Sequence, residues 1–384
     1  MTTANWSYPT AIRFGAGRIA ELGAACKAAG IARPLFVTDP GIAPLPIAAR
    51  ALDVMRADGL APEVFTDVKP NPTDANVEAG IAALRAGDHD GVVAFGGGSA
   101  LDCGKVVAFM RGQSRPMWDF EDVGDWWTRA DPAGIAPIVA VPTTAGTGSE
   151  VGRAGVITNL AEHVKKVIFH PKMLPAQVIL DPELTVGLPP ALTAGTGMDA
   201  LAHCLEAYFA PSYHPMAEGI AVEGVRLVKE YLPRAYHDGT DLEARGNMLS
   251  AAAMGATAFQ KGLGAIHALS HPVGALYDTH HGLTNAVFMP YVLAFNRAGI
   301  ADKADRLAGW LGLAGGLDGL IDWVLELRRE LGVPHDLGGI RVDDARFDAM
   351  AAMAVVDPTA GGNPRELAVA DALDLYRRAA EGRV

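Results

Sequence analysis

The chain has little cysteine, and the cysteines it has form no pattern. Cys26, Cys103 and Cys204 are the three cysteines among 384 residues, and they lie far apart with no paired spacing. This distribution excludes a disulfide framework and a zinc site built on thiolates. Unpaired cysteines suit a reducing compartment, so we expect a cytoplasmic protein.

Positive charge and long apolar runs are also scarce. Lysine and arginine number 32 against 44 aspartates and glutamates, for a net charge of −12. Nucleic-acid binders and binders of anionic membranes need surplus basic residues, so we expect neither kind of partner. No apolar run approaches the ~20 residues that cross a bilayer. The opening MTTANWSYPT lacks the basic start and apolar stretch of a secretory signal.

Two kinds of hydrophobic pattern divide the chain, whose length suits two domains of roughly 150 residues or more. Up to residue 185, short β-branched runs alternate with amphipathic stretches, which is typical of an α/β domain with a parallel sheet. Over 186–384, alanine- and leucine-rich segments with helical periodicity predict an all-α domain. We expect a helix over 73–87 and strands at 34–39, 63–65, 91–97, 136–142, 155–158 and 176–181.

A glycine triplet follows the strand expected at 91–97. Gly96, Gly97 and Gly98 permit close backbone approach, and Ser99 is placed to cap a helix that begins at Ala100. The free amides and the positive dipole at that helix start can hold a pyrophosphate. The alternative is an ordinary tight turn from strand to helix, and the spacing is not that of the usual dinucleotide-binding fingerprint.

Two further segments suit a dinucleotide. VPTTAGTGSE (141–150) runs from a strand into small residues, where Thr143, Thr144 and Thr147 offer hydroxyl donors. Asp39 closes the strand at 34–39, where a carboxylate can accept hydrogen bonds from a ribose diol and repel a 2′-phosphate, which favours NAD over NADP. The simpler alternatives are a plain loop for 141–150 and a turn aspartate before Pro40.

Histidines cluster in the second half of the chain. Asp199 and His203 are four residues apart in an expected helix, so both side chains leave the same face. His267 and His271 repeat this spacing, and a pair of histidines, 280 and 281, follows shortly after. Imidazoles with one carboxylate suit a divalent transition ion such as iron(II) or zinc. Spacing alone does not say which histidines bind, and buried histidines that only hydrogen-bond are the alternative.

Four ordered motifs together resemble the iron-containing alcohol dehydrogenases, the metal-dependent group also called type III. The motifs are GGGSALDCGK (96–105), VPTTAGTGSE (141–150), GMDALAHCLEAY (197–208) and HALSHPVGALYDTHHG (267–282). The similarity extends from YPTAIRFGAGRIAELG (8–23) to NPRELAVADALDLYRRAA (363–380), which is nearly the whole chain. The resemblance implies a dehydroquinate synthase-like fold, with an α/β Rossmann-like nucleotide-binding domain over 1–185 and an all-α metal-binding domain over 186–384.

The resemblance also implies roles for individual residues. It makes Asp199, His203, His267 and His281 the metal ligands and places His271 near the metal and the nicotinamide, while His280 inherits no role. For NAD it indicates Asp39, Asn71, Gly97, Gly98, Ser99, Asp102, Thr143, Thr144, Thr147 and Lys165. Lys166 adjoins Lys165, and the roles of Asp102 and Lys105 do not follow from charge or spacing.

The implied reaction is hydride transfer between NAD(H) and a small primary alcohol, diol or ω-hydroxy acid, with the aldehyde as the oxidised form. We expect His271 to handle a proton or orient the nicotinamide, because imidazole titrates near neutrality. Arg153 follows the threonine-containing segment 141–150, and a guanidinium there would favour a carboxylate-bearing substrate. The resemblance implies at least a homodimer. The alternatives are an NAD-retaining lyase or cyclase of the same fold and a regulatory protein without turnover.

Overall fold

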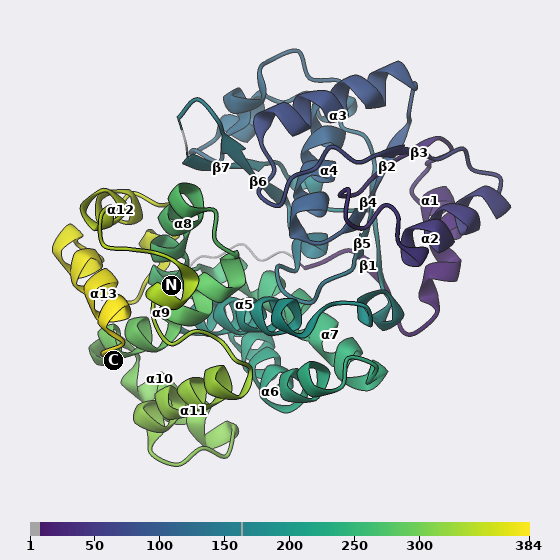
Figure 1. The fold of residues 1–384 in the computed structure, drawn as a ribbon. Coiled ribbons are helices and arrows are strands. Elements are labelled where there is room, and N and C mark those ends of the chain that lie inside the picture. The colour runs from purple at the N-terminus through teal and green to yellow at the C-terminus, as the bar shows by residue number, and fades with distance from the viewer. Residues whose placement is uncertain (1–7, 163) are drawn as a thin grey trace. The chain divides into compact units, whose positions relative to one another are not determined.

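The computed structural model describes residues 8–162 and 164–384, and these divide into two compact units, Tyr8–Gly187 and Leu188–Val384 (Figure 1). The strands of the first unit are β1 (Ala11–Phe14), β2 (Pro34–Val37), β3 (Glu63–Phe65), β4 (Gly91–Gly96), β5 (Ile138–Pro142), β6 (Ala154–Asn159), β7 (Val164–Phe169) and β8 (Gln177–Leu180). Its helices are α1 (Leu22–Ala28), α2 (Pro46–Ala57), α3 (Asp74–Ala86) and α4 (Gly98–Met110).

The core of the first unit is a six-stranded parallel sheet with the order β1-β8-β5-β4-β2-β3. Every residue of its central strands β2, β4 and β5 is buried, which is why they read as continuous apolar runs. The predicted α/β architecture is confirmed.

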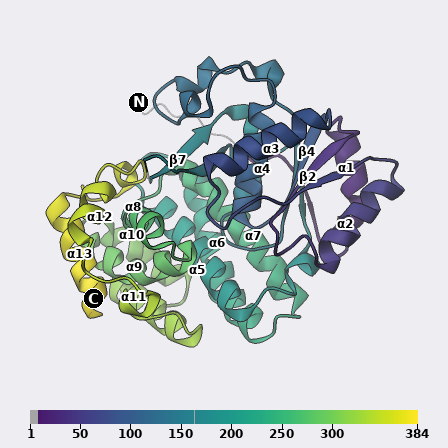
Figure 2. The same cartoon turned by 45° about the horizontal axis from the view of Figure 1, so that its top comes forward.

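Helices cover both faces of this sheet (Figure 2). Alternate strand residues, such as Phe36, Phe95 and Val141, pack with α1 and α2 in one buried cluster. The other face carries α4, which approaches closely because a Cβ on Gly104 would lie 2.8 Å from the Cβ of Ala94. Helix α3 packs beside α4.

The helix expected over 73–87 is confirmed as α3. The Thr73 side chain accepts a hydrogen bond from the Asn76 backbone, and the Asn76 side chain in turn accepts from the Thr73 backbone. This reciprocal cap starts the helix, and Gly87 ends it.

The sheet prediction was wrong about the pairing of β6, and it missed β7 and β1. The segment expected at 155–158 is β6, which pairs antiparallel with β7 in a separate two-stranded sheet and takes no part in the parallel one. Strand β1 was not expected, because its four residues are largely exposed and show no buried run. It lies at the edge of the large sheet and pairs with β8.

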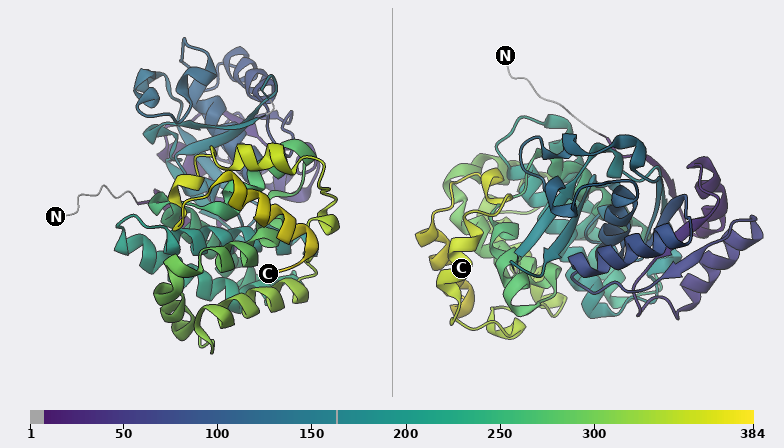
Figure 3. Two further views of the ribbon diagram at one scale, coloured as in Figure 1. Left: turned by 90° about the vertical axis from the view of Figure 1, so that its left-hand side faces the viewer. Right: turned by 90° about the horizontal axis from the view of Figure 1, so that it is seen from above.

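The second unit is helical throughout its described secondary structure, as predicted. Its helices are α5 (Pro190–Phe209), α6 (Pro215–His237), α7 (Leu242–Ala258), α8 (Ala265–Tyr277), α9 (His281–Phe295), α10 (Arg297–Trp310), α11 (Gly316–Glu330), α12 (Phe347–Ala354) and α13 (Val369–Glu381). Figure 3 shows the C-terminal helices α12 and α13 against this bundle, where they pack on α8 and α9.

Helix α5 is the central element of this unit. Almost all of its residues from Thr193 onward are buried, and α6, α7 and α9 pack around it. Its C-terminal carbonyls receive the buried ammonium of Lys261, a favourable charge at the negative end of a helix. Among the described residues, no helix combines the length and the apolar character that a bilayer crossing requires.

Candidate active site

In the first unit, the turn after β4 brings several predicted cofactor residues together. Gly96 has a φ of 146°, and a Cβ there would lie 2.8 Å from the Cβ of Ala100 and 3.6 Å from Oδ2 of Asp39. A Cβ on Gly98 would lie 2.5 Å from Cγ2 of Thr147. The turn therefore requires glycine, and it places Asp39 and Thr147 beside the start of α4.

The N-terminus of α4 has no side-chain cap. The helix begins at Gly98 with Gly97 as its N-cap, so the expectation that Ser99 caps a helix from Ala100 is wrong. The Ser99 hydroxyl instead donates to the carbonyl of Pro70. Uncapped first-turn amides are the groups that hold phosphate at a helix start.

The loop that contains Asn71 reaches the same region. Its neighbour Pro70 accepts the Ser99 hydrogen bond, and the amide oxygen of Asn71 accepts from Nζ of Lys165 at 2.8 Å. Of the two adjacent lysines, Lys166 points to Glu121 and Glu162 and forms ion pairs with them. Lys165 is thus the lysine that shares a location with predicted cofactor residues.

Asp39 has the contacts of a turn aspartate, which was one of the two alternatives considered for it. Its Oδ1 accepts hydrogen bonds from the amides of Gly41 and Ile42, each at 2.9 Å, as in a turn aspartate. Those two bonds use one carboxylate oxygen. The other, Oδ2, faces the glycine turn, 3.6 Å from where a Cβ on Gly96 would lie.

Asp102 and Lys105 bind the end of the threonine loop, which contains Thr143, Thr144 and Thr147. The carboxylate of Asp102 accepts from the Ser149 hydroxyl at 2.5 Å and from the Val156 amide at 3.0 Å. The buried ammonium of Lys105 donates to the carbonyls of Ser149 and Ala154 and lies 3.2 Å from Asp102. Both oxygens of Asp102 therefore serve the loop end and β6.

Glu150 lies in the same buried layer. Burial raises the pKa of its carboxyl from 4.5 to about 7, although its own backbone amide and nearby Lys105 act in the opposite direction. The loop over 143–149 thus rests on a buried layer of charged side chains, which the sequence pattern alone did not explain.

In the second unit, the four predicted metal ligands come together from three helices. Asp199 and His203 lie on α5, His267 on α8, and His281 is the first residue of α9. Oδ1 of Asp199 lies 4.0 Å from Nε2 of His203, 3.9 Å from Nε2 of His267 and 3.6 Å from Nε2 of His281. Asp199, His203 and His267 are buried and form a set able to hold a metal ion.

Glu206 supports this group and was missed in the sequence. Its Oε2 lies 2.5 Å from Nδ1 of His267, and its Oε1 accepts the amide of Ile266 at 2.7 Å. Burial lowers the pKa of His267, but the carboxylates of Glu206, Asp199 and Asp357 together outweigh burial and leave the pKa above its ordinary value. The signal was available, because Glu206 follows His203 by three residues on the same helix face.

Asn285 was also missed. It lies on α9 one turn after His281, and its amide nitrogen lies within 3.2 Å of Asp199 Oδ1, His267 Nε2 and His281 Nε2. Three acceptor atoms whose lone pairs meet at one donor are arranged as they would be around a cation. One carboxylate and three imidazoles also form the donor set that divalent transition ions prefer, so the residues fit such an ion.

His271 lies beside this group with a partner of its own. Its Nδ1 is 2.8 Å from Oδ2 of Asp357, and its ring stacks on His281 with centroids 5.4 Å apart. Burial raises the pKa of Asp357, but His271 and Thr359 bring it below its ordinary value. Asp357 was not among the predicted residues.

The structure separates the two adjacent histidines. His280 is the N-cap of α9, where its Nδ1 accepts from the amide of Leu283 at 3.3 Å, and burial lowers its pKa. It packs against Gly195, where a Cβ would lie 2.7 Å from its ring. His280 is therefore a structural cap, whereas His281 points its Nε2 toward Asp199.

Arg153 extends from the start of β6. Its guanidinium lies over the ring of Phe169, 5.5 Å from the centroid, and its carbonyl accepts from the amide of His170. Among the described residues, its guanidinium takes part in no hydrogen bond and no ion pair within 4.0 Å. Burial raises the pKa of Asp122, and the positive charge of Arg153 lowers that pKa by a smaller amount.

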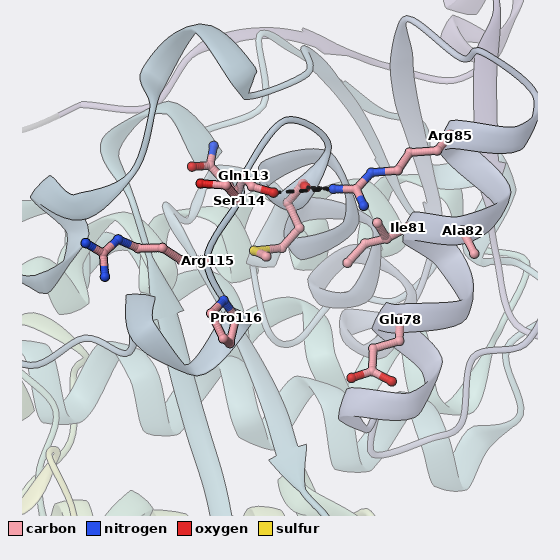
Figure 4. Close-up of a pocket in the computed structure, with 9 residues that line it drawn as sticks. Glu78, Ile81, Ala82, Arg85, Gln113, Ser114, Arg115 and Pro116 are labelled. Atoms are coloured by element: carbon pink, nitrogen blue, oxygen red, sulfur yellow. Dashed lines mark hydrogen bonds between the residues drawn. The ribbon is translucent and has the colours of Figure 1, made fainter.

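An open pocket of about 400 Å³ lies elsewhere in the first unit, between α3 and the segment after α4 (Figure 4). Arg85 crosses it to donate to the carbonyls of Met110 and Gln113. None of the predicted site residues lines this pocket.

Comparison with known proteins agrees with this geometry. The family model "Iron-containing alcohol dehydrogenase" matches residues 9–182, and the model "Fe-containing alcohol dehydrogenase family, C-terminal" matches residues 193–380. A 4-hydroxybutyrate dehydrogenase of Cupriavidus necator is 41% identical, with 97% of this chain and 98% of that protein covered. A 1,3-propanediol dehydrogenase of Klebsiella pneumoniae is 37% identical, with 95% and 96% covered.

Solved structures give the same result. A 1,3-propanediol oxidoreductase superposes with a TM-score of 0.94 at 35% identity, covering 98% of this chain and all of the other (100%). A sulfoacetaldehyde reductase of Bifidobacterium kashiwanohense, solved in complex with NAD+, has a TM-score of 0.90 at 30% identity, with 99% of each chain covered. These relatives support the dehydrogenase reading and not the lyase alternative. The chain belongs to the iron-containing alcohol dehydrogenase family.

Proposed function

We propose that this protein is an NAD-dependent, metal-dependent dehydrogenase that interconverts a small primary alcohol, diol or ω-hydroxy acid and its aldehyde by hydride transfer. The observation that carries this proposal is the meeting of one carboxylate and three imidazoles in the interior of the helical unit. Burying so many polar atoms in one place costs free energy, and packing alone gives no reason for it.

Asp199, His203, His267 and His281 would hold the divalent ion, either iron(II) or zinc. The chemistry available at such a site is Lewis-acid polarisation of the alcohol or carbonyl oxygen. Glu206 would hold the ring of His267 with Nδ1 protonated, so that Nε2 presents its lone pair. Burial of Asp199, His203 and His267 keeps water from competing for these groups.

The first unit would bind NAD. The uncapped start of α4, with Gly97, Gly98 and Ser99, suits the pyrophosphate, and Asp39 suits the adenosine ribose. Asp102 would act indirectly, because its carboxylate is used by the threonine loop. We also assign to the dinucleotide the remaining predicted cofactor residues, Asn71, Thr143, Thr144, Thr147 and Lys165, which is supported by the hydrogen bonds of the Asn71 loop. We accordingly assign nucleotide binding to 1–185 and metal binding to 186–384.

His271 would hold or move the proton. Its Nδ1 is engaged by Asp357, which fixes the ring and leaves Nε2 as the atom that exchanges a proton. This arrangement makes Asp357 a positioning residue for His271.

We also propose a homodimer located in the cytoplasm. Strand β1 is an open sheet edge, and Ile12 and Phe14 expose 37% and 49% of their surface there, which suits pairing with another copy. The three cysteines are free and buried, as suits a reducing compartment. Light scattering on a size-exclusion column tests the dimer, and an Ile12→Lys variant should be a monomer.

For the substrate, Arg153 favours a molecule that carries a carboxylate, since its guanidinium has no acidic partner in contact. The similarity to a 4-hydroxybutyrate dehydrogenase supports the same class. An Arg153→Ala variant should then lose efficiency with 4-hydroxybutyrate and keep its efficiency with butanol. Equal losses with both substrates would remove Arg153 from substrate selection.

The decisive experiment is a metal analysis combined with an NADH absorbance assay. Metal-replete protein is tested with NAD and with NADP against short alcohols, diols, 4-hydroxybutyrate and 3-hydroxypropionate. We expect reduction of NAD with at least one of them and a weaker reaction with NADP. No net NADH formation with any substrate would contradict the proposed function.

A further inference from the structure

The amide of Asn285 is the most unusual polar group near the predicted ligands. The residue is fully buried, and its Nδ2 lies 2.8 Å from Oδ1 of Asp199, 3.1 Å from Nε2 of His281 and 3.2 Å from Nε2 of His267. One amide thus reaches three of the four predicted ligands at once. The fourth, His203, is carried on the same helix as Asp199.

Chemistry determines which end of the amide faces the ligands. At 2.8 Å from a carboxylate oxygen, an amide N–H forms a strong hydrogen bond, whereas an amide oxygen would be repelled. The oxygen Oδ1 therefore points away, and it has no hydrogen-bond partner among the described residues. An unpaired buried acceptor costs free energy, which a residue kept only for packing would have no reason to bear.

The neighbouring contacts make the two imidazoles suitable acceptors. Glu206 takes the Nδ1 side of His267, so Nε2 of a neutral ring carries a lone pair toward Asn285. Asp199 receives the shortest of the three contacts, and the same Oδ1 lies within 4.0 Å of Nε2 of His203, His267 and His281. The amide is therefore placed to determine how the Asp199 carboxylate is turned.

We propose that Asn285 is a positioning residue of the metal centre. The N–H directed at Asp199 orients its carboxylate, whose Oδ1 keeps a second lone pair for the ion, so that the ion meets a preorganised ligand. Nε2 of each imidazole has a single lone pair, so the ion would replace the contacts of the amide with His267 and His281. This inference rests on the proposed function, because it takes these side chains as the metal ligands. Residues that orient ligands from outside the coordination sphere typically alter metal affinity by roughly 10- to 100-fold.

The test measures zinc affinity by titrating metal-free protein against a competing chelator. Asn285→Ala and Asn285→Leu both remove the donor, and leucine keeps the volume, so that a cavity does not explain the result. We expect both to weaken zinc binding by about 10- to 100-fold. The matched control is Thr284→Val on the same helix, which removes the hydroxyl bonds to Thr279 and His280 and leaves the ligands untouched.

A second readout separates positioning from packing. In the Co²⁺-substituted protein, the visible absorption bands report the geometry of the ligands, and they should change in Asn285→Leu and remain unchanged in Thr284→Val. A variant whose stability falls while its zinc affinity and cobalt spectrum match the unchanged protein would overturn the inference. If Asn285→Ala does not fold, Asn285→Leu decides by the same two measurements.

A further variant keeps this inference distinct from the proposed function. If Asp199→Ala binds zinc as tightly as the unchanged protein, the predicted metal site is wrong and the role of Asn285 falls with it. If Asp199→Ala loses zinc while both Asn285 variants retain full affinity, the metal site stands and only the role of Asn285 is wrong.

Discussion

The two units build their candidate sites from different parts of the polypeptide. In Tyr8–Gly187 the key groups are backbone amides at the end of β4, where glycine allows other atoms to come close. In Leu188–Val384 they are side chains in the interior of buried helices. Backbone amides attract anions, whereas carboxylates and imidazoles attract cations. Each site should therefore respond to a different kind of substitution.

The largest effect is expected from Asp199→Ala. Loss of the only carboxylate among the predicted ligands should remove the metal and lower kcat/KM by at least ~1000-fold, about 4 kcal/mol of transition-state stabilisation. Binding of NADH, followed by its fluorescence, should stay unchanged, since the cofactor residues lie in the other unit. Metal bound at full stoichiometry in this variant would contradict the assignment.

The second largest effect is on the free energy of unfolding, and it comes from a residue of the first unit, Glu150. The carboxyl of Glu150 has its pKa raised from 4.5 to about 7. Its contribution is fully present below pH 4.5 and is lost as the pH rises to about 7, because the folded protein then binds more protons than the unfolded one. A Glu150→Gln variant should abolish this loss.

The size of the Glu150 effect follows from the shift. Between pH 4.5 and 7 the free energy of unfolding should fall by up to about 3 kcal/mol more in the unchanged protein than in Glu150→Gln. Urea denaturation at a series of pH values measures the difference. Parallel pH profiles for the two proteins would show that Glu150 does not titrate in this range.

His271→Ala tests the boundary between ligand and proton carrier within the second unit. Removing a general acid or base should lower kcat by about 100-fold or more. The metal content should stay at the level of the unchanged protein, because His271 forms its hydrogen bond with Asp357, which is not a predicted ligand. Loss of metal in proportion to activity would instead make His271 a ligand.

The smallest effect is expected from Gly98→Ala, the counterpart of Asp199→Ala in the first unit. The added methyl would meet Thr147 at 2.5 Å and displace it from the helix start. We expect the KM for NAD to rise by about tenfold, since a phosphate-binding turn loses its close fit, with metal content unchanged. Gly219→Ala, whose methyl meets nothing within 4 Å, is the control. Equal KM values in the two variants would contradict a role for Gly98.

Local patterns predicted most of the fold. The buried runs at 91–97 and 136–142 became β4 and β5, and Thr73 and Gly87 ended α3 where the sequence indicated. A strand at 155–158 was predicted and is β6, but its expected place in the parallel sheet was wrong, because its alternating burial is that of a hairpin strand with one covered face. The sequence of residues 155–158 does not determine which strand they pair with, because pairing also depends on residues further along the chain.

The candidate site was predictable in part for the same reason. Spacing placed Asp199 and His203 on one face of α5, yet it left His280 and His281 equivalent. The N-cap hydrogen bond between His280 and the Leu283 amide distinguishes the two histidines, and it forms only when α9 begins at His281. Glu206 and Asn285 each lie one helical turn after a predicted ligand, but this spacing alone does not predict that their side chains contact His267.

By itself, the sequence determined the two kinds of secondary structure, the family, and which short segments carry chemistry, because helical and strand periodicities and motif residues are local properties. The meeting of Asp199, His203, His267 and His281 with Asn285 depends instead on how α5, α8 and α9 pack in three dimensions. The physical reason is that those distances depend on how buried helix faces pack against one another, and packing joins residues far apart in the chain.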